Sequence, residues 1–209
     1  MVEEEQDCDK VTAEGQRDPE AIRAVRNAAF RSLFATGAPV SLLEIAAAAS
    51  LAEDEVRDAM RTLESRGRTQ LDPLGRIVTC GGLSVEPTRH RVETGGVTRW
   101  TRCAYDALGI LGALEGGGRV VSASPLDETT IEVGFAEGSP TTDDAVLFYA
   151  EGYEACESVY EQWCPMVNLF PNREDAERWA EVHQVTGRVR SLADATKCAT
   201  TEWRPLLAR

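Results

Sequence analysis

The sequence predicts an α+β fold, with an N-terminal three-helix, winged-helix-like module followed by a mixed α+β domain of short, mainly antiparallel strands. Apolar residues recur at helical spacing in the first third of the chain, short β-like runs with glycine turns follow, and further helical stretches lie between those runs. We therefore divide the 209 residues into an acidic tail (1–18), a winged-helix-like module (19–80) and a mixed domain (81–209).

The N-terminal segment 1–18 is polar and acidic, with few large apolar side chains that could support packing. We expect it to form a mobile tail without catalytic residues. The first helix is predicted to begin with Asp18 as its cap and Pro19 at its first position, and to end at Gly37.

Two more helices and a hairpin complete the predicted module. Ser41 caps the second helix, 42–49, and Glu44 is its partner in a capping box. The third helix covers 53–66, and the turn Asp72-Pro73-Leu74-Gly75 joins the two short strands of a hairpin. Three helices followed by a hairpin are typical of a winged helix.

Winged helices often bind DNA through the third helix, but the charges here oppose that function. Residues 53–68 hold five acidic side chains against four arginines, so this helix has no basic face. The whole chain has a formal net charge of −13, which also disfavours nucleic acids and anionic membranes as partners, because both require clustered Lys and Arg. We interpret the module as a packing or lid element.

The mixed domain is predicted from alternating strands and helices. The expected strands are 90–93, 97–100, 119–123, 129–135 and 145–150. The expected helices are 103–114, 172–183 and 191–203, the last beginning with a capping box of Ser191 and Asp194. The glycine pair Gly95-Gly96 is expected to join the first two strands in a hairpin.

Six cysteines are scattered along the chain without a C-x-x-C pair, which excludes a zinc ribbon and a thioredoxin-like motif. They are Cys8, Cys80, Cys103, Cys156, Cys164 and Cys198. The N-terminus lacks the basic and apolar segments of a secretory signal, and no apolar run is long enough to span a bilayer. We therefore expect a cytoplasmic protein whose cysteines are free thiols.

Cys103 and Asp106 lie three residues apart at the predicted start of a helix, so their side chains share one face. Backbone N–H groups and the helix dipole at this end favour a thiolate, which is the form of cysteine that binds soft metals. Arg102 would add to this effect if it points inward. The spacing also permits a second interpretation, in which Asp106 lies at the surface while Cys103 and Cys164 are ordinary buried thiols.

Four sequence blocks resemble the alkylmercury lyase family in their order and spacing. They are Gly82-Leu83 with Pro87-Thr88-Arg89-His90-Arg91, then Cys103-Ala104-Tyr105-Asp106-Ala107-Leu108, then Trp163-Cys164 with Val167 and Phe170, and Glu174-Asp175-Ala176-Glu177-Arg178-Trp179-Ala180 with His183-Gln184. The resemblance covers about residues 82–207. It implies a catalytic domain at 81–209, preceded by a winged-helix-like module that agrees with the pattern of residues 19–78.

The resemblance implies that Cys103 and Cys164 are the catalytic cysteines that bind mercury, and that Asp106 is the catalytic aspartate beside them and a further candidate to contact the metal. Two positions depart from the family pattern. Arg102 stands where an aromatic residue is expected, and Pro165 stands where some members have another cysteine. These departures concern substrate preference more than chemistry.

The implied reaction is the protonolysis of a carbon–mercury bond, which gives a hydrocarbon and mercuric ion. Two thiolates suit mercury because it is a very soft cation, and neither His90 nor His183 is required. Asp106 is expected to take a proton from a cysteine thiol and return it to the departing carbon. With ordinary pKa values near 3.9 for Asp and 8.5 for Cys, this transfer is uphill by about 4.6 units unless mercury acidifies the thiol.

No organic cofactor is implied. The expected partners are the organomercurial substrate, small cellular thiols that displace the mercuric ion, and mercuric reductase, without nucleic acid or membrane. Five apolar residues are candidates to surround the organic group, although their spacing is also typical of plain core. They are Trp100, Tyr105, Trp163, Met166 and Phe170. The cysteines at 8, 80, 156 and 198 match no catalytic position of the family.

Two other functions stay open on the sequence. One is a cysteine-based metal-sensing winged-helix regulator, which would bind an operator in a DNA shift assay. The other is a noncatalytic mercury-binding protein, which would keep its mercury affinity after replacement of Asp106 and would have no turnover to lose.

Overall fold

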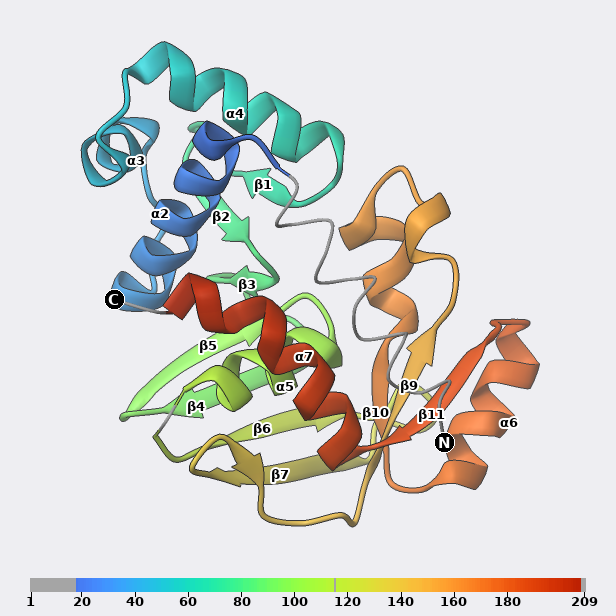
Figure 1. Ribbon diagram of the computed structural model, residues 1–209. Helices are drawn as coiled ribbons and strands as arrows, with labels where there is room; N and C mark the ends of the chain where they lie inside the picture. The colour runs from blue at the N-terminus through green and yellow to red at the C-terminus, as the bar shows by residue number, and fades with distance from the viewer. Residues whose placement is uncertain (1–17, 115, 208–209) are drawn as a thin grey trace.

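The computed structural model describes residues 18–114 and 116–207, so the tail predicted at 1–17 lies outside the described residues. Helices α2 (Glu20–Thr36), α3 (Leu42–Ala49) and α4 (Glu53–Ser65) pack together at one end of the molecule (Figure 1). The second half of the chain alternates helices with the strands of two antiparallel sheets. This is the predicted mixed α+β class.

The start of the first helix differs from the prediction. Helix α2 begins at Glu20, Pro19 occupies the cap position, and no side chain caps the helix. The Asp18 carboxylate is buried instead, where it accepts a 2.6 Å hydrogen bond from Arg66 and lies 3.7 Å from Arg26. Charge-assisted contacts with two arginines offset the cost of burying this carboxylate. Asp18 therefore belongs to the packed part of the chain and not to the tail.

Two other local predictions in this region, a capping box and a hairpin, are confirmed. Ser41 and Glu44 form the capping box of α3, with the Glu44 carboxylate accepting the Ser41 N–H at 2.8 Å. Strands β1 (Thr69–Leu71) and β2 (Ile77–Cys80) pair antiparallel as a hairpin. The turn between them is fixed by Asp72, whose side chain accepts backbone N–H groups within the turn.

The hairpin is continuous with the second half of the molecule. The larger sheet has eight strands in the order β1-β2-β3-β5-β4-β6-β7-β8. Its further strands are β3 (Leu83–Ser84), β4 (His90–Thr94), β5 (Val97–Thr101), β6 (Gly118–Ala123), β7 (Thr130–Ala136) and β8 (Ser139–Pro140). Because β3 pairs with β2 on one side and with β5 on the other, the hairpin that follows the N-terminal helices lies in one sheet with strands of the second half.

The smaller sheet has three strands in the order β10-β9-β11. They are β10 (Asn168–Phe170), β9 (Val146–Ala150) and β11 (Gly187–Ser191). Helix α6 (Arg173–His183) packs on this sheet through Trp179, whose ring contacts Phe148 and Phe170. Strand β11 was not predicted, because two arginines alternate with its other residues and it is only partly buried.

Helices α5 (Ala104–Ala113) and α7 (Leu192–Leu207) pack closely against each other (Figure 1). Two glycines of α5 make this approach possible, since a Cβ at Gly109 would lie 2.2 Å from the Trp203 ring and one at Gly112 would lie 2.1 Å from Thr200. The first eight residues of α5 are all buried. Within 18–114 and 116–207, none of the helices combines the length and the hydropathy needed to cross a membrane.

Candidate active site

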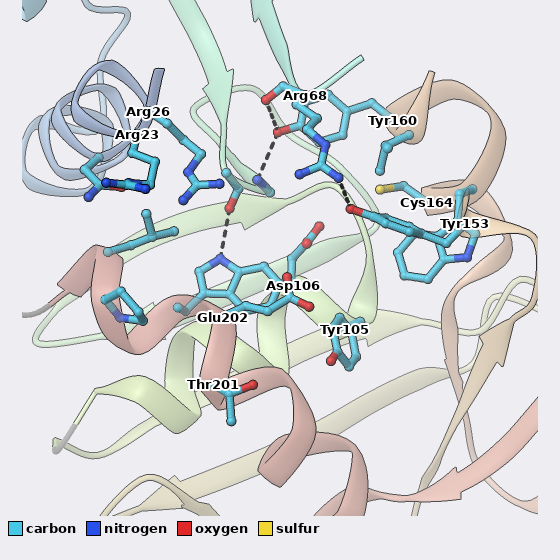
Figure 2. Close-up of a pocket in the computed structure, with 18 residues that line it drawn as sticks. Arg23, Arg26, Arg68, Tyr105, Asp106, Tyr153, Tyr160, Cys164, Thr201 and Glu202 are labelled. Atoms are coloured by element: carbon cyan, nitrogen blue, oxygen red, sulfur yellow. Dashed lines mark hydrogen bonds between the residues drawn. The ribbon is translucent and has the colours of Figure 1, made fainter. Parts of the chain in front are cut away.

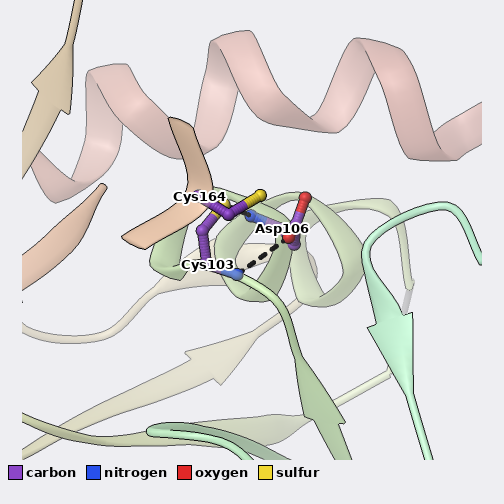
Figure 3. A group of neighbouring side chains, drawn as sticks. All are labelled: Cys103, Asp106 and Cys164. Carbon is purple, nitrogen blue, oxygen red and sulfur yellow. Dashed lines mark hydrogen bonds between the residues drawn. The ribbon is translucent and has the colours of Figure 1, made fainter. Parts of the chain in front are cut away.

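The three predicted site residues lie together in the structure (Figure 3). One ligand atom each from Cys103, Asp106 and Cys164 lies within 4.8 Å of the other two, and all three residues are buried. Cys103 and Asp106 come from the start of α5, while Cys164 lies where the π-helical turn η2 (Val159–Trp163) meets the 3-10 turn η3 (Cys164–Met166). Because Asp106 is only 6% exposed, the interpretation that it is a surface residue is wrong.

Cys103 is the N-cap of α5 and not a residue of its first turn. Its Sγ accepts the backbone N–H of Asp106 at 3.5 Å, and Oδ2 of Asp106 accepts the backbone N–H of Cys103 at 2.9 Å. This is a capping box in which a cysteine replaces the usual serine or threonine and an aspartate replaces the usual glutamate. The cap therefore fixes the positions of two site residues at once.

Cys164 is held by backbone hydrogen bonds on both sides. Its own N–H donates to the carbonyl of Val159 and closes the π-helical turn. Its carbonyl accepts the N–H of Val167 at 3.1 Å, and the Val167 carbonyl accepts the N–H of Ala104, the first residue of α5, also at 3.1 Å. This last bond joins the segment that carries Cys164 to the helix that carries Asp106.

The Asp106 carboxyl packs directly against the backbone of Gly82. Gly82 has a φ of +79°, and a Cβ there would lie 2.4 Å from Cγ of Asp106. Both the backbone conformation and the lack of space require glycine at this position. The Gly82-Leu83 block of the sequence thus shapes the site although it carries no reactive side chain.

Burial raises the pKa of the Asp106 carboxyl from 3.8 to about 6, although hydrogen bonds from Cys103 and the charge of Arg102 lower it in part. An aspartate with such a pKa is present in both protonation states near neutral pH. It can therefore both accept and donate a proton under these conditions.

The two thiols are also harder to ionise than ordinary cysteines. Burial raises the pKa of Cys103 well above its usual value, and a hydrogen bond with Cys164 and the charge of Asp106 raise it further. At Cys164 the hydrogen bond with Cys103 lowers the pKa, but burial and the charge of Asp106 together outweigh it. The prediction that the helix terminus favours a Cys103 thiolate is therefore wrong for the protein alone, because desolvation exceeds the effect of the hydrogen bond from the Asp106 backbone N–H.

The raised pKa of Asp106 predicts a pH dependence of stability. Ionised Asp106 is disfavoured in the fold, so its contribution to stability is fully present below pH 3.8 and is lost as the pH rises through about 6. Relative to Asp106→Asn, the wild-type free energy of unfolding should fall by about 2 kcal/mol between pH 4 and 7. Urea unfolding of both proteins at several pH values measures this difference, and a difference that stays constant with pH would contradict the prediction.

A cavity of about 400 Å³ opens beside the three residues (Figure 2). Asp106 and Cys164 line it, whereas Cys103 is not among its lining residues. Of the five residues predicted to surround the organic group, Tyr105 and Trp163 line the cavity. The other three, Trp100, Met166 and Phe170, are not among its lining residues.

Several lining residues were missed by the sequence reasoning. Tyr160 precedes Cys164 by about one helical turn, and that spacing was the available signal. Trp203 reaches the cavity from α7 and donates its Nε1–H to the carbonyl of Gly81 at 2.9 Å, a contact that no local pattern predicts. Three arginines also line the cavity: Arg23, Arg26 and Arg68.

The other cysteines of the described residues lie outside the site. Cys80 is buried and free, and burial raises its pKa to about 11. Cys156 is half-buried, and its Sγ donates to the carbonyl of Tyr153 at 2.9 Å. Cys198 is disulfide-bonded, so the expectation of free thiols is wrong at this position. Cys8 lies outside the described residues.

Comparisons with known proteins agree on one family. The sequence model of the alkylmercury lyase family, MerB, matches residues 83–203. An alkylmercury lyase of Streptomyces lividans is 31% identical over 175 residues, which cover 78% of this chain and 74% of that protein. An alkylmercury lyase of Staphylococcus epidermidis is 29% identical over 163 residues, covering 72% and 69% of the two chains.

A solved structure shares the fold. The crystal structure of the mercury-bound form of MerB2 superposes with a TM-score of 0.81 over 100% of both chains. The two sequences are 22% identical, so this likeness concerns the fold alone.

Proposed function

This chain belongs to the alkylmercury lyase family, and from that membership we propose that Cys103, Asp106 and Cys164 carry out its reaction. The protein is an organomercurial lyase, which cleaves a carbon–mercury bond by protonolysis and releases a hydrocarbon and mercuric ion. The observation that supports the assignment of residues is the cluster of two thiols and one carboxyl within 4.8 Å beside a cavity. Thiolates are the ligands that a soft cation such as mercury prefers.

In this proposal, mercury binds to Cys164 first and to Cys103 second. A substrate R–Hg–X, in which X is a halide or a thiolate, meets Cys164 first because Cys164 lines the cavity and Cys103 does not. The Cys164 sulfur forms a bond to mercury, and X leaves with the thiol proton. The organic group stays on mercury, close to the aromatic rings of Tyr105 and Trp163 in the cavity wall.

Cleavage follows when Cys103 forms the second sulfur–mercury bond. Its thiol proton passes to Asp106, and Asp106 then delivers a proton to the carbon while the carbon–mercury bond breaks. The electron pair of that bond becomes the new carbon–hydrogen bond. In sum, R–Hg–X and two thiols give R–H, HX and mercuric ion bound to two sulfurs, with Asp106 unchanged.

The environment of Asp106 suits this double role. A carboxyl with a pKa of about 6 is a better base than an ordinary aspartate and still donates its proton near neutral pH. Because burial also raises the pKa of the Cys103 thiol, the carboxyl alone does not drive its ionisation. Binding of mercury to the sulfur supplies that driving force, since metal ligation requires the deprotonated thiol.

The proposed partners and cellular location follow from the product, mercuric ion. We propose that small cellular thiols displace the mercuric ion, that mercuric reductase accepts it, and that no organic cofactor takes part. These thiols are abundant in the cytoplasm, which is the proposed location. We also propose that residues 19–80 act as a winged-helix-like packing module whose helix α2 supplies part of the cavity wall, and that 81–209 form the catalytic domain. The comparisons do not favour the metal-sensing regulator.

Headspace gas analysis of the purified protein tests the function directly. With methylmercury and an excess of a small thiol, we expect more than one methane per protein chain. If no methane forms while mercury stays bound to the protein, the chain is a noncatalytic mercury binder. A DNA shift assay with and without mercury serves as the control for the regulator, and we expect no shift.

A further inference from the structure

Arg102 contacts the segment that carries Cys164 although it precedes Cys103 in the chain. Its backbone N–H donates to the carbonyl of Gly82 at 2.8 Å. Its guanidinium donates to the backbone carbonyl of Tyr160 at 3.2 Å and lies over the Tyr160 ring, with Cζ 5.3 Å from the ring centroid. The side chain therefore bridges two segments that are far apart in the sequence.

Tyr160 is fixed by these contacts and by its hydroxyl. The hydroxyl accepts the N–H of Gly82 at 3.0 Å and donates to the carbonyl of Arg68 at 2.6 Å. The ring, the carbonyl and the hydroxyl of Tyr160 are thus each held by a separate contact. Two of those contacts come from Arg102, and the third includes Gly82, the residue against which Asp106 packs.

The position of Tyr160 determines the position of Cys164. Tyr160 belongs to the π-helical turn that ends where Cys164 donates its N–H to the carbonyl of Val159, so the two residues are linked by one turn of backbone. Cys103 belongs to a different segment, directly after Arg102. The contact between Arg102 and Tyr160 therefore connects the segments that supply the two sulfurs.

This arrangement has an energetic cost. Nε of Arg102 is buried and has no hydrogen-bond partner among the described residues, and an unsatisfied buried donor destabilises a fold. An aromatic side chain, which the family pattern leads us to expect here, carries no such donor. The charge of Arg102 also lowers the pKa values of Asp106 and Cys164, so the guanidinium lies close enough to act on both groups.

We propose that Arg102 is a positioning residue for the lyase reaction: it holds Tyr160, and with it the turn of Cys164, where one mercury atom bridges the sulfurs of Cys103 and Cys164. The inference rests on the proposed function of these two cysteines. It assigns a role to a residue at which this chain departs from the family pattern.

The test compares Arg102→Gln and Arg102→Lys with Arg119→Gln, which removes an arginine from exposed ion pairs on the large sheet. For Arg102→Gln we expect kcat for methane release to fall roughly 10- to 100-fold, as for a displaced catalytic group. X-ray absorption of bound mercuric ion should show one protein sulfur in place of two. Arg102→Lys should recover only part of the activity, because an ammonium lacks the planar fork that covers the Tyr160 ring.

Thermal unfolding separates positioning from loss of structure, and the melting temperature of Arg102→Gln should match that of the Arg119→Gln control. Tyr160→Phe is a second test that can be used if an Arg102 variant does not fold. It removes only the hydroxyl contacts of Tyr160, so we expect a smaller loss of kcat of the same kind. Wild-type kcat with two-sulfur coordination in Arg102→Gln would overturn the inference and leave the lyase assignment intact. Failure of the wild-type protein to release methane would instead reject the proposed function, and the sulfur coordination of mercury would still test Arg102.

Discussion

Asp106→Asn is expected to lower the rate of hydrocarbon release by at least about 100-fold while mercuric ion still binds to both cysteines. The asparagine side-chain oxygen can accept the Cys103 N–H as the carboxylate does, so the capping box at the start of α5 should survive. The amide cannot take a proton from the thiol and return it to carbon. Single-turnover headspace analysis, with mercury content of the protein measured in parallel, checks both parts of this prediction.

Asp58→Asn is the matched control for this variant. Asp58 is an exposed carboxylate that pairs with Arg61 on the surface of α4, so its replacement should leave turnover unchanged. Wild-type rates in Asp106→Asn would show that another group, or water, delivers the proton. Loss of mercury binding in Asp106→Asn would show instead that the carboxyl is needed to hold the metal.

Cys103→Ser and Cys164→Ser are each expected to reduce hydrocarbon release below detection, because a hydroxyl is too hard a ligand for mercury. The two variants should differ in how they fail. Cys103→Ser keeps Cys164 in the cavity and should retain methylmercury on one sulfur, uncleaved. Cys164→Ser should capture methylmercury slowly, since its remaining site thiol does not line the cavity. Intact-protein mass spectrometry after timed exposure to methylmercury distinguishes these outcomes.

Serine is the appropriate replacement at Cys103, because a hydroxyl accepts the Asp106 N–H and preserves the helix cap. Cys156→Ala is the control for loss of a thiol outside the site, and it should turn over methylmercury like the wild-type protein. Rapid capture by Cys164→Ser would contradict the proposed order of binding. Residual catalysis in either serine variant would contradict the need for two sulfurs.

Much of the fold could be predicted from local signals. Two confirmed examples depend only on residues that are close together in the sequence. They are the capping box of Ser41 and Glu44 and the hairpin around Asp72. Strand β11 was missed because its burial depends on pairing with β9, which is distant in the sequence. The role of Asp18 was wrong for the same reason, since its partner Arg66 lies 48 residues away.

The candidate site was likewise predictable only in part from local sequence signals. Asp106 could be placed beside Cys103 from helical spacing, but only the family resemblance brought Cys164 to them. Their closeness depends on how η2 and η3 pack on α5, which no local pattern encodes. The effect of burial on the pKa values of the thiols could not be predicted from the sequence either, because desolvation depends on all the surrounding atoms.

Because Cys103 caps helix α5, the two cysteine sulfurs should differ in how readily they release mercuric ion. The Cys103 sulfur accepts a backbone N–H of α5, so rotating it away would leave that donor unsatisfied at a cost of about 1 kcal/mol. The Cys164 sulfur faces the cavity through which an incoming thiol must arrive. We therefore expect exchange to start at Cys164, so that the sulfur that receives mercury first also releases it first, and Cys103 retains the metal until a second thiol completes the transfer.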